Sequence, residues 1–321
     1  MHEYQAISQK IKAEIARAQT ILVISHQKPD GDTLGSNLAF SQILKQQGKT
    51  VTSFCLDQVP ELFQFLPHHE QVTNNHLVFS KHYDLVIVVD SGSLNYAGVE
   101  LLITALKDYK LINIDHHASN PLYGDVNLVI PTASSCAEVI YRLLKDWQIK
   151  INSEVATLLA CGMITDTGGF INPATSYQVL QAAADLIAQG ANLSQISKIT
   201  LGNKNVNNLK LWGRAFSRLQ YVKKYNLVYT FITQKDFLEC ETDENSAEGI
   251  SNFLHVLQDA KIILVLKESI DGQIKGSLRT TEDDIDLSKL AGIFGGGGHK
   301  KASGFALPGR LSYDKNKLRI I

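Results

Sequence analysis

Between residues 20 and 170, short apolar runs alternate with stretches in which apolar residues recur at helical spacing. The apolar runs occupy residues 21–24, 85–89 and 111–114. Runs of this kind are typical of strands that are buried on both faces of a parallel sheet. Their alternation with amphipathic stretches predicts an α/β fold, in which a mainly parallel sheet carries helices on both faces.

The same pattern predicts where these elements begin and end. Strands are expected at residues 21–25, 51–55, 83–90 and 111–115, and helices near residues 33–47 and 101–109. A further helix is expected after a cap at Ser134 or Ser135. Ser153 is expected to cap the next helix, which would carry Asp166 at its C-terminal end.

After Gly190 the apolar pattern weakens and then resumes with different spacing. Residues 191–212 are polar and predict a partly helical connector that acts as a hinge. Beyond it, the segments 219–222 and 227–232, and the segments 262–267 and 273–279, predict two hairpins. Helices are expected near residues 247–258 and 287–294, and a strand near residues 304–307. We therefore predict a first domain at residues 1–190 and a smaller C-terminal α/β domain at residues 213–321.

Histidine and aspartate residues follow the apolar runs of the first domain. A single Asp in such a place is commonly a turn or cap residue. Here every run ends in the same way, and the carboxyl ends of parallel strands meet in one crevice. Carboxylate and imidazole together suit hard or borderline divalent cations. The predicted metal ligands are His26, Asp30, Asp32, Asp90, His116 and Asp166.

The charge of this set predicts how many cations it would hold. Two carboxylates about 4 Å apart repel by about 4 kcal/mol at an effective dielectric constant near 20. Two divalent cations would balance the four Asp residues, and Asp90, being single and central in order, is the candidate bridge. Such a pair of cations can clamp a phosphoryl group. Asp115 is expected to orient one imidazole, which would leave His117 to face a substrate.

A second motif is the run Gly295, Gly296, Gly297, Gly298 and His299. Glycine allows close backbone approach, so successive N–H groups could form an anion nest. We therefore predict a phosphate-binding loop here. Arg279 stands at the end of a predicted strand, and its planar guanidinium has the shape for bidentate recognition of a phosphate.

Composition limits the partners of the chain. A net charge of −1 over 321 residues argues against a long groove for duplex nucleic acid, although a local basic pocket could hold a short oligonucleotide. The four Cys residues are scattered, which is typical of reduced, buried thiols. No apolar stretch is long enough to span a membrane, so we expect a cytoplasmic protein.

Taken together, these motifs resemble the DHH superfamily of phosphoesterases. The matching segments are residues 26–32, 88–90, 113–117, which include the Asp-His-His triplet that names the family, 165–169 and 295–299. The resemblance extends to the two-domain nanoRNase branch, oligoribonucleases that also dephosphorylate 3′-phosphoadenosine 5′-phosphate (pAp). It implies hydrolysis of RNA oligomers of two to five nucleotides to mononucleotides.

The resemblance also implies a role for each matching residue. His26, Asp30 and Asp90 would bind one metal ion, and Asp32, Asp90, His116 and Asp166 the other. His117 would contact the scissile phosphate and assist the leaving group. The metal would be manganese, with magnesium or cobalt as substitutes. Arg279 and His299 would contact substrate phosphate.

Two other functions stay open at this point. One is a phosphodiesterase for linear dinucleotides formed from cyclic dinucleotides, which uses the same chemistry. The other is a protein that senses a nucleotide with a vestigial site. The oligomeric state is open too, a homodimer included. We further expect the crevice to close around short substrates, with the connector as the hinge.

Overall fold

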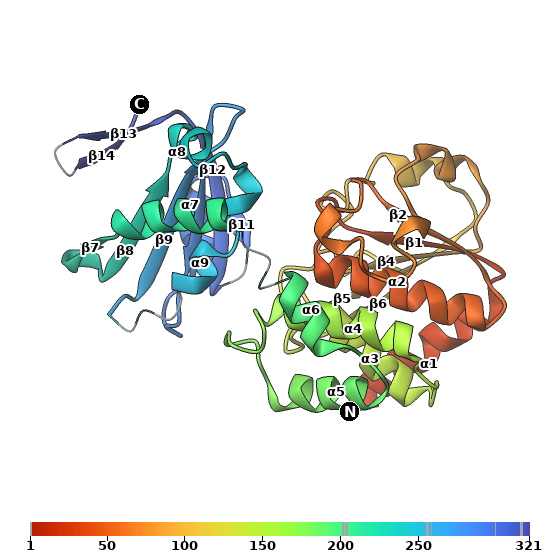
Figure 1. Ribbon diagram of the computed structural model, residues 1–321. Coiled ribbons are helices and arrows are strands. Elements are labelled where there is room, and N and C mark those ends of the chain that lie inside the picture. Colours follow the sequence, from red (N-terminus) through yellow and green to blue (C-terminus); the bar gives the residue numbers. More distant parts are fainter. Residues whose placement is uncertain are drawn as a thin grey trace. The chain divides into compact units, whose positions relative to one another are not determined.

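The computed structural model describes residues 2–200, 202, 205–254, 257, 259–298, 300–314 and 317–321 (Figure 1). The chain divides into two compact units, residues 1–202 and residues 203–321. Each unit has its own sheet and its own apolar core. Within the described part of the chain, no helix is both long and apolar enough to cross a membrane.

The first unit is built on a six-stranded parallel sheet with the strand order β3-β2-β1-β4-β5-β6. The predicted strands are present, and β3 and β6 are additional. The strands are β1 (Thr20–Ser25), β2 (Thr50–Cys55), β3 (Val72–Thr73), β4 (Leu85–Val89), β5 (Lys110–Asp115) and β6 (Val126–Val129).

Successive residues of the central strands enter two different cores. In β1, Ile21 and Val23 belong to one cluster, and Leu22 and Ile24 belong to the other. This is why the central strands are apolar at every position rather than at every second position. The alternation confirms the prediction of a parallel sheet that is covered on both faces.

Long helices cover one of these faces. They are α1 (His2–Arg17), α2 (Gly31–Gln46), α3 (Cys136–Asp146), α4 (Ser153–Asp166), α5 (Tyr177–Ala188) and α6 (Leu193–Thr200). Ser135 caps α3, as predicted. The cap of α4 is Asn152 rather than Ser153, because the Asn152 side chain accepts the N–H of Val155. Asn152 and Ser153 are both of a type that caps helices, so the sequence alone left the start of α4 ambiguous by one position.

The other face of the sheet is covered by short 3-10 helices, η3 (His76–Ser80) and η4 (Leu102–Ala105). The predicted helix at residues 101–109 is therefore wrong in type and length. Val99, Ile103 and Leu106 are buried at helical spacing. However, Asp108 takes a left-handed backbone conformation just before β5, which leaves room for one turn only.

The second unit holds a mixed sheet with the order β11-β12-β10-β9-β8-β7. Both predicted hairpins are confirmed, as β7 pairs antiparallel with β8 and β9 pairs antiparallel with β10. A terminal hairpin was not predicted. The strands are β7 (Gln220–Val222), β8 (Leu227–Ile232), β9 (Ile262–Glu268), β10 (Gln273–Arg279), β11 (Gly297–Gly298), β12 (Ala302–Pro308), β13 (Leu311–Asp314) and β14 (Lys317–Ile320).

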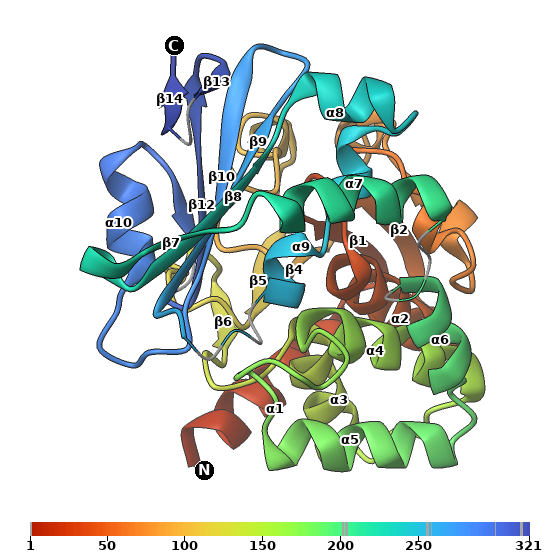
Figure 2. The same ribbon diagram turned by 60° about the vertical axis from the view of Figure 1, so that its left-hand side comes forward.

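Helices lie on both faces of this second sheet. Figure 2 shows α10 (Leu287–Ile293) on one face, and α7 (Val206–Ser217) and α9 (Ile250–Phe253) on the other. Helix α8 (Gln234–Glu239) lies between β8 and β9 in the chain. The helix predicted at residues 247–258 begins only at Ile250, as α9, because Gly249 before it has a φ of 89°. Residues 255, 256 and 258 of that prediction lie outside the described residues.

The segment predicted as a connector is divided between the two units. Helix α6 contributes Ile196 to the core of the first unit. Helix α7 contributes Leu211 and Ala215 to the core of the second unit. The division between the units follows Gly202.

Candidate metal centre

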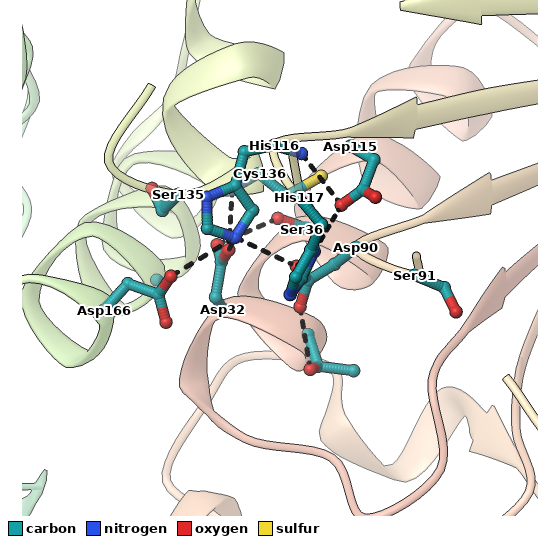
Figure 3. A network of polar contacts seen from close by, with 12 residues as sticks. Asp32, Ser36, Asp90, Ser91, Asp115, His116, His117, Ser135, Cys136 and Asp166 are labelled. Carbon is teal, nitrogen blue, oxygen red and sulfur yellow. Dashed lines mark hydrogen bonds and ion pairs between the residues drawn. The ribbon is translucent and has the colours of Figure 1, made fainter. Parts of the chain in front are cut away.

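The predicted ligands of the first unit gather where β1, β4 and β5 end (Figure 3). The chain runs outward from β1 through β2 to β3 on one side and from β4 to β6 on the other, so the strand order reverses between β1 and β4. Open parallel sheets bind ligands at such a switch point. His26 follows β1, Asp90 follows β4, and Asp115, which begins the triplet, is the last residue of β5.

A first group consists of His26, Asp30 and Asp90, whose ligand atoms all lie within 4.8 Å of one another. His26 Nε2 is 3.5 Å from Asp90 Oδ2. The Thr33 hydroxyl lies among them, at 2.6 Å from His26 Nε2 and 2.9 Å from both Asp30 Oδ1 and Asp90 Oδ2. Thr33 was missed from the sequence, although it immediately follows the His-x-x-x-Asp-x-Asp segment.

A second group consists of Asp32, His116 and Asp166. Figure 3 shows the His116 ring among three carboxylates. Its Nε2 is 3.4 Å from Asp166 Oδ2, 3.8 Å from Asp32 Oδ2 and 3.6 Å from Asp90 Oδ1. Asp90 therefore points one oxygen toward each group, which is the arrangement that a bridging ligand needs.

Asp115 is occupied with orienting its neighbours. Its Oδ1 accepts the His117 Nδ1–H at 2.7 Å and the backbone N–H of His116 at 2.8 Å. Its Oδ2 accepts the side-chain amide of Asn120 at 2.7 Å. Since Nδ1 of His117 is engaged, Nε2 points away from Asp115. The imidazole that Asp115 orients is thus that of His117.

The N-terminus of α3 holds Asp32 in place. Asp32 Oδ2 accepts the N–H of Cys136 at 2.6 Å, and Oδ1 accepts the N–H of Ala137 at 2.9 Å. Both N–H groups belong to the first turn of a helix, where donors have no partner within the helix. The start of α3 therefore stabilises a buried carboxylate that the sequence places far away in the chain.

Close contact between α2 and α4 depends on glycine. A Cβ at Gly35 would come 2.4 Å from the carbonyl oxygen of Leu158, and a Cβ at Gly162 would come 2.5 Å from Asp32 Oδ1. No side chain fits at either position without moving a helix. These glycines thus set the distance between Asp32 at the start of α2 and Asp166 at the end of α4.

The backbone at Asp90 is strained. Its φ of 55° is in the left-handed region, which costs a non-glycine residue roughly 1 kcal/mol. Its N–H donates to the carbonyl of Ile114 at 3.0 Å, so the turn is tied to β5. Strain of this kind gathers at functional positions, where the surrounding structure holds it.

Burial and neighbouring charge affect the carboxylates unequally. Burial, and then the charges of the other Asp residues, raises the pKa of Asp32 and of Asp166 well above the ordinary value. Burial also opposes ionisation of Asp90, but the hydrogen bond and charge of His26 outweigh it and lower the pKa of Asp90. Asp32 and Asp166 therefore need nearby positive charge to ionise fully.

The histidines show the same competition. Burial disfavours the charged form of His26, but Asp90 and then Asp30 raise its pKa to about 9. Burial opposes charge on His117 too, and the Asp115 carboxylate outweighs it and raises the pKa of His117. For His116 burial prevails and lowers the pKa, so this ring stays neutral, as a metal ligand must be.

The donor set fits divalent cations. It consists of carboxylate oxygens and imidazole nitrogens in two groups that have Asp90 between them, without thiolate. Cys136 is nearby, but burial raises the pKa of its thiol well above the ordinary value, and the thiol donates to the carbonyl of Ile114. The centre therefore offers oxygen and nitrogen ligands only.

In the second unit, Arg279 lines a cavity of about 300 Å³. Its floor is formed by β9 and β10, and its wall by residues 247–252. The Arg279 Nε–H donates to Asn252 at 3.0 Å, and burial lowers the pKa of the guanidinium. Lys267 also lines the cavity, and burial lowers its pKa too. The lining residues are Ala247, Glu248, Gly249, Ser251, Asn252, Val265, Lys267, Ser277 and Arg279.

The glycine run does not form the expected open nest along its whole length. The N–H groups of Gly295 and Gly296 donate to Gly292 and Ala291, so they satisfy carbonyls at the end of α10. Gly297 and Gly298 form β11, which pairs with β12. The nest prediction is therefore wrong for Gly295 and Gly296, and His299 lies outside the described residues.

Arg279 and the glycine run nevertheless occupy the same end of the second sheet. Arg279 is opposite Ala302 on β12, and Gly298 is opposite the next residue of that strand. With strands about 4.8 Å apart, Gly298 lies about 10 Å from Arg279 across the sheet.

Two family models match the chain. The model described as the DHH family, N-terminal domain, matches residues 20–163, and the DHHA1 domain model matches residues 224–319. The first range includes every candidate metal ligand except Asp166. The second includes Arg279 and the glycine run.

Curated relatives match nearly the whole chain. It is 26% identical to the bifunctional oligoribonuclease and PAP phosphatase NrnA of Thermus thermophilus, over 97% of this chain and 92% of that protein. It is 28% identical to the protein of the same name from Bacillus subtilis, over 92% and 93%. Among solved structures, an exopolyphosphatase-related protein from Bacteroides fragilis has a TM-score of 0.87 at 24% identity, covering 97% of this chain and 93% of that one.

Proposed function

Because the chain belongs to the DHH family of phosphoesterases, we propose that it hydrolyses short RNA oligonucleotides to mononucleotides and removes the 3′-phosphate of pAp. The relatives that carry this double activity in their names match it from end to end. Short RNA oligonucleotides are products of RNA degradation, which would place the enzyme in the cytoplasm.

The observation that carries the proposal is the pair of ligand groups that have Asp90 between them, with one of its oxygens toward each. One is His26, Asp30 and Asp90, and the other is Asp32, His116 and Asp166. A nucleotide-binding protein without catalysis would not need two groups at this spacing. The complete set of candidate ligands therefore argues for turnover and against a vestigial site.

We propose that each group holds one divalent cation, with Mn²⁺ preferred and Mg²⁺ or Co²⁺ able to replace it. When bound, such cations supply charge that stabilises a phosphoryl transition state and acidifies water. The ligand set does not choose among these metals, because oxygen and imidazole ligands suit all three.

The chain itself would supply the proton that hydrolysis requires. Water adds to phosphorus, the bond from phosphorus to the leaving oxygen breaks, and that oxygen takes up a proton. His117 can give this proton, since Asp115 raises its pKa and fixes its orientation. The same step serves an RNA linkage and the 3′-phosphate of pAp.

The cavity at Arg279 would hold another part of the substrate. Its volume of about 300 Å³ is at the small end of ligand pockets, which suits one nucleotide unit rather than a long strand. The guanidinium and Lys267 would attract a phosphate there. We propose that Gly297 and Gly298 add contacts at the same end of the sheet, and that His299 contacts the substrate phosphate.

The test is a set of RNA substrates labelled at the 5′ end, from dinucleotides to strands of about twenty nucleotides. Two further substrates are pAp and a linear dinucleotide of the kind that is formed from a cyclic dinucleotide. We expect Mn²⁺-dependent release of mononucleotide that is fastest for the shortest strands, together with phosphate release from pAp. If only the dinucleotide derived from a cyclic dinucleotide were cleaved, the result would favour a phosphodiesterase for such linear dinucleotides. Mn²⁺ binding without any turnover would contradict the proposal.

A further inference from the structure

Tyr96 lies beside the first ligand group. Its ring is tilted against the His26 imidazole, with 4.9 Å between the ring centroids. The residue is 48% exposed, so one side of the ring contacts the candidate centre and the rest faces solvent. None of the six predicted ligands or the two predicted catalytic residues supplies a group of this kind.

The loop that carries Tyr96 is held firmly by its own hydrogen bonds. The N–H of Tyr96 donates to the Ser93 hydroxyl at 3.0 Å, and the N–H of Ala97 donates to the Ser93 carbonyl at 3.0 Å. Gly98 follows with a φ of 72°, and a Cβ there would come 2.5 Å from the Leu56 side chain. The loop is thus packed closely enough to hold the phenol in one place before a ligand arrives.

The hydroxyl of Tyr96 has no hydrogen-bond partner among the described residues. Tyr123 offers a contrast, because its hydroxyl donates to the Ser91 carbonyl at 2.8 Å. The charged groups that act on the Tyr96 hydroxyl are Asp30, Asp90 and Asp166, which are all candidate metal ligands.

A neutral hydrogen-bond donor suits a position beside these carboxylates. A Lys or Arg beside these carboxylates would pair with them and compete with the cations. A phenol stays uncharged near neutral pH, so it neither competes for the carboxylates nor repels a phosphate. It can still donate one hydrogen bond to an anionic oxygen.

We propose that the Tyr96 hydroxyl donates a hydrogen bond to a non-bridging oxygen of the phosphate that is cleaved. This inference rests on the proposed function, because it requires a phosphate at the candidate centre. It makes Tyr96 a catalytic residue that acts on the phosphate itself. The contact would then be the same for every substrate, whatever its base.

The experiment compares the wild type with Tyr96→Phe, which keeps the ring on His26 and removes only the hydroxyl. Tyr225→Phe is the matched control, since Tyr225 is an exposed residue of the second unit. Turnover of an RNA dinucleotide and of pAp is measured with Mn²⁺. In parallel, calorimetry measures the affinity of each protein for Mn²⁺ alone, and the affinity of the Mn²⁺-loaded protein for inorganic phosphate.

We expect Tyr96→Phe to lower kcat by about ten- to a hundredfold on both substrates, as loss of a hydrogen bond to a charged group does. Phosphate affinity should fall by about tenfold, while Mn²⁺ affinity and the control stay at wild-type values. Unchanged phosphate affinity would overturn the inference, and so would a loss of turnover confined to one of the two substrates. A wild type that turns over neither substrate would refute the proposed function, and the phosphate measurement would still decide the role of Tyr96.

Discussion

Asp90 combines three features in one residue: a left-handed backbone, a lowered pKa and one oxygen toward each ligand group. The left-handed backbone at Asp90 costs the metal-free protein roughly 1 kcal/mol. Asp90 belongs to the His26 group and also to a further group with Asp115, His116 and His117, and no other described carboxylate belongs to both of these groups.

We therefore expect Asp90→Asn to lower turnover by roughly a thousandfold or more while the protein stays folded. Asn is the variant of choice, since it tolerates the left-handed conformation and keeps the shape of the side chain. The measurement is thermal unfolding with and without Mn²⁺. The wild type should be stabilised by the metal and the variant much less, because stabilisation follows metal affinity. Retained turnover would refute the bridging role.

At the scale of elements, the contact of α2 with α4 joins the two halves of the second ligand group. Gly162 is a point of close approach, because its missing Cβ leaves space for the Asp32 carboxylate and for Ala137. The side chains that would bind metal are thus placed by a residue that has no side chain.

Gly162→Ala is expected to destabilise the protein by about 1–3 kcal/mol, as overpacking does. We also expect Mn²⁺ affinity to fall by about ten- to a hundredfold, because Asp32 must move. The control is Gly213→Ala in α7, where a Cβ meets nothing within 4 Å. The control should be neutral or slightly stabilising, by up to about 1 kcal/mol. Denaturant unfolding measures the stability of both variants, and metal titration measures their Mn²⁺ affinity. Equal changes in the two variants would contradict the packing argument.

A second element-level prediction concerns Asp236, which closes a capping box with Thr233 at the start of α8 and pairs with Arg218. Burial opposes its ionisation, but Arg218 and Thr233 outweigh it and lower the pKa of Asp236. Asp236→Asn should destabilise the second unit by about 3 kcal/mol at neutral pH.

The pH dependence of this effect follows from the direction of the shift. A lowered pKa means that the ionised Asp236 stabilises the fold above the ordinary carboxylate pKa of about 4, and that this is lost as the pH falls through the folded-state value. The difference between wild type and variant should thus be full at pH 7 and shrink below about pH 4. A difference independent of pH would contradict the role of the charge.

At the scale of the whole molecule, the chain has two units with separate cores, and the one candidate metal centre among the described residues lies in the first unit. Mn²⁺ should therefore raise the unfolding temperature of the first unit and leave that of the second unit unchanged. Differential scanning calorimetry of the full chain, with and without chelator, measures both.

The size of this stabilisation should depend on pH. Asp32 and Asp166 have raised pKa values without metal, so the metal-free first unit gains from their protonation and loses stability as the pH rises. Mn²⁺ needs the deprotonated carboxylates. Stabilisation by Mn²⁺ should hence be larger near pH 8 than near pH 5. The opposite trend would contradict the assignment of both residues as ligands.

Much of this architecture is local in origin and can be predicted from the sequence. The buried strands are apolar at every position, the hairpins carry turn residues, and the His and Asp residues follow strand ends. Because parallel strands share one edge, the sequence was sufficient to predict that His26, Asp90 and His116 would meet. It was also sufficient to place Asp166 at the end of a helix and Arg279 at the end of β10.

Tertiary structure decided everything that depends on residues distant in the chain. It shortened the helices expected at residues 101–109 and 247–258, used the N–H groups of Gly295 and Gly296 to end α10, and brought the Asp32 carboxylate against the first turn of α3. It also brought Thr33 into the first group and Tyr96 onto His26. The physical reason is the same in each case. A backbone donor or a buried carboxylate must find its partner in space, and a sequence pattern records only its neighbours along the chain.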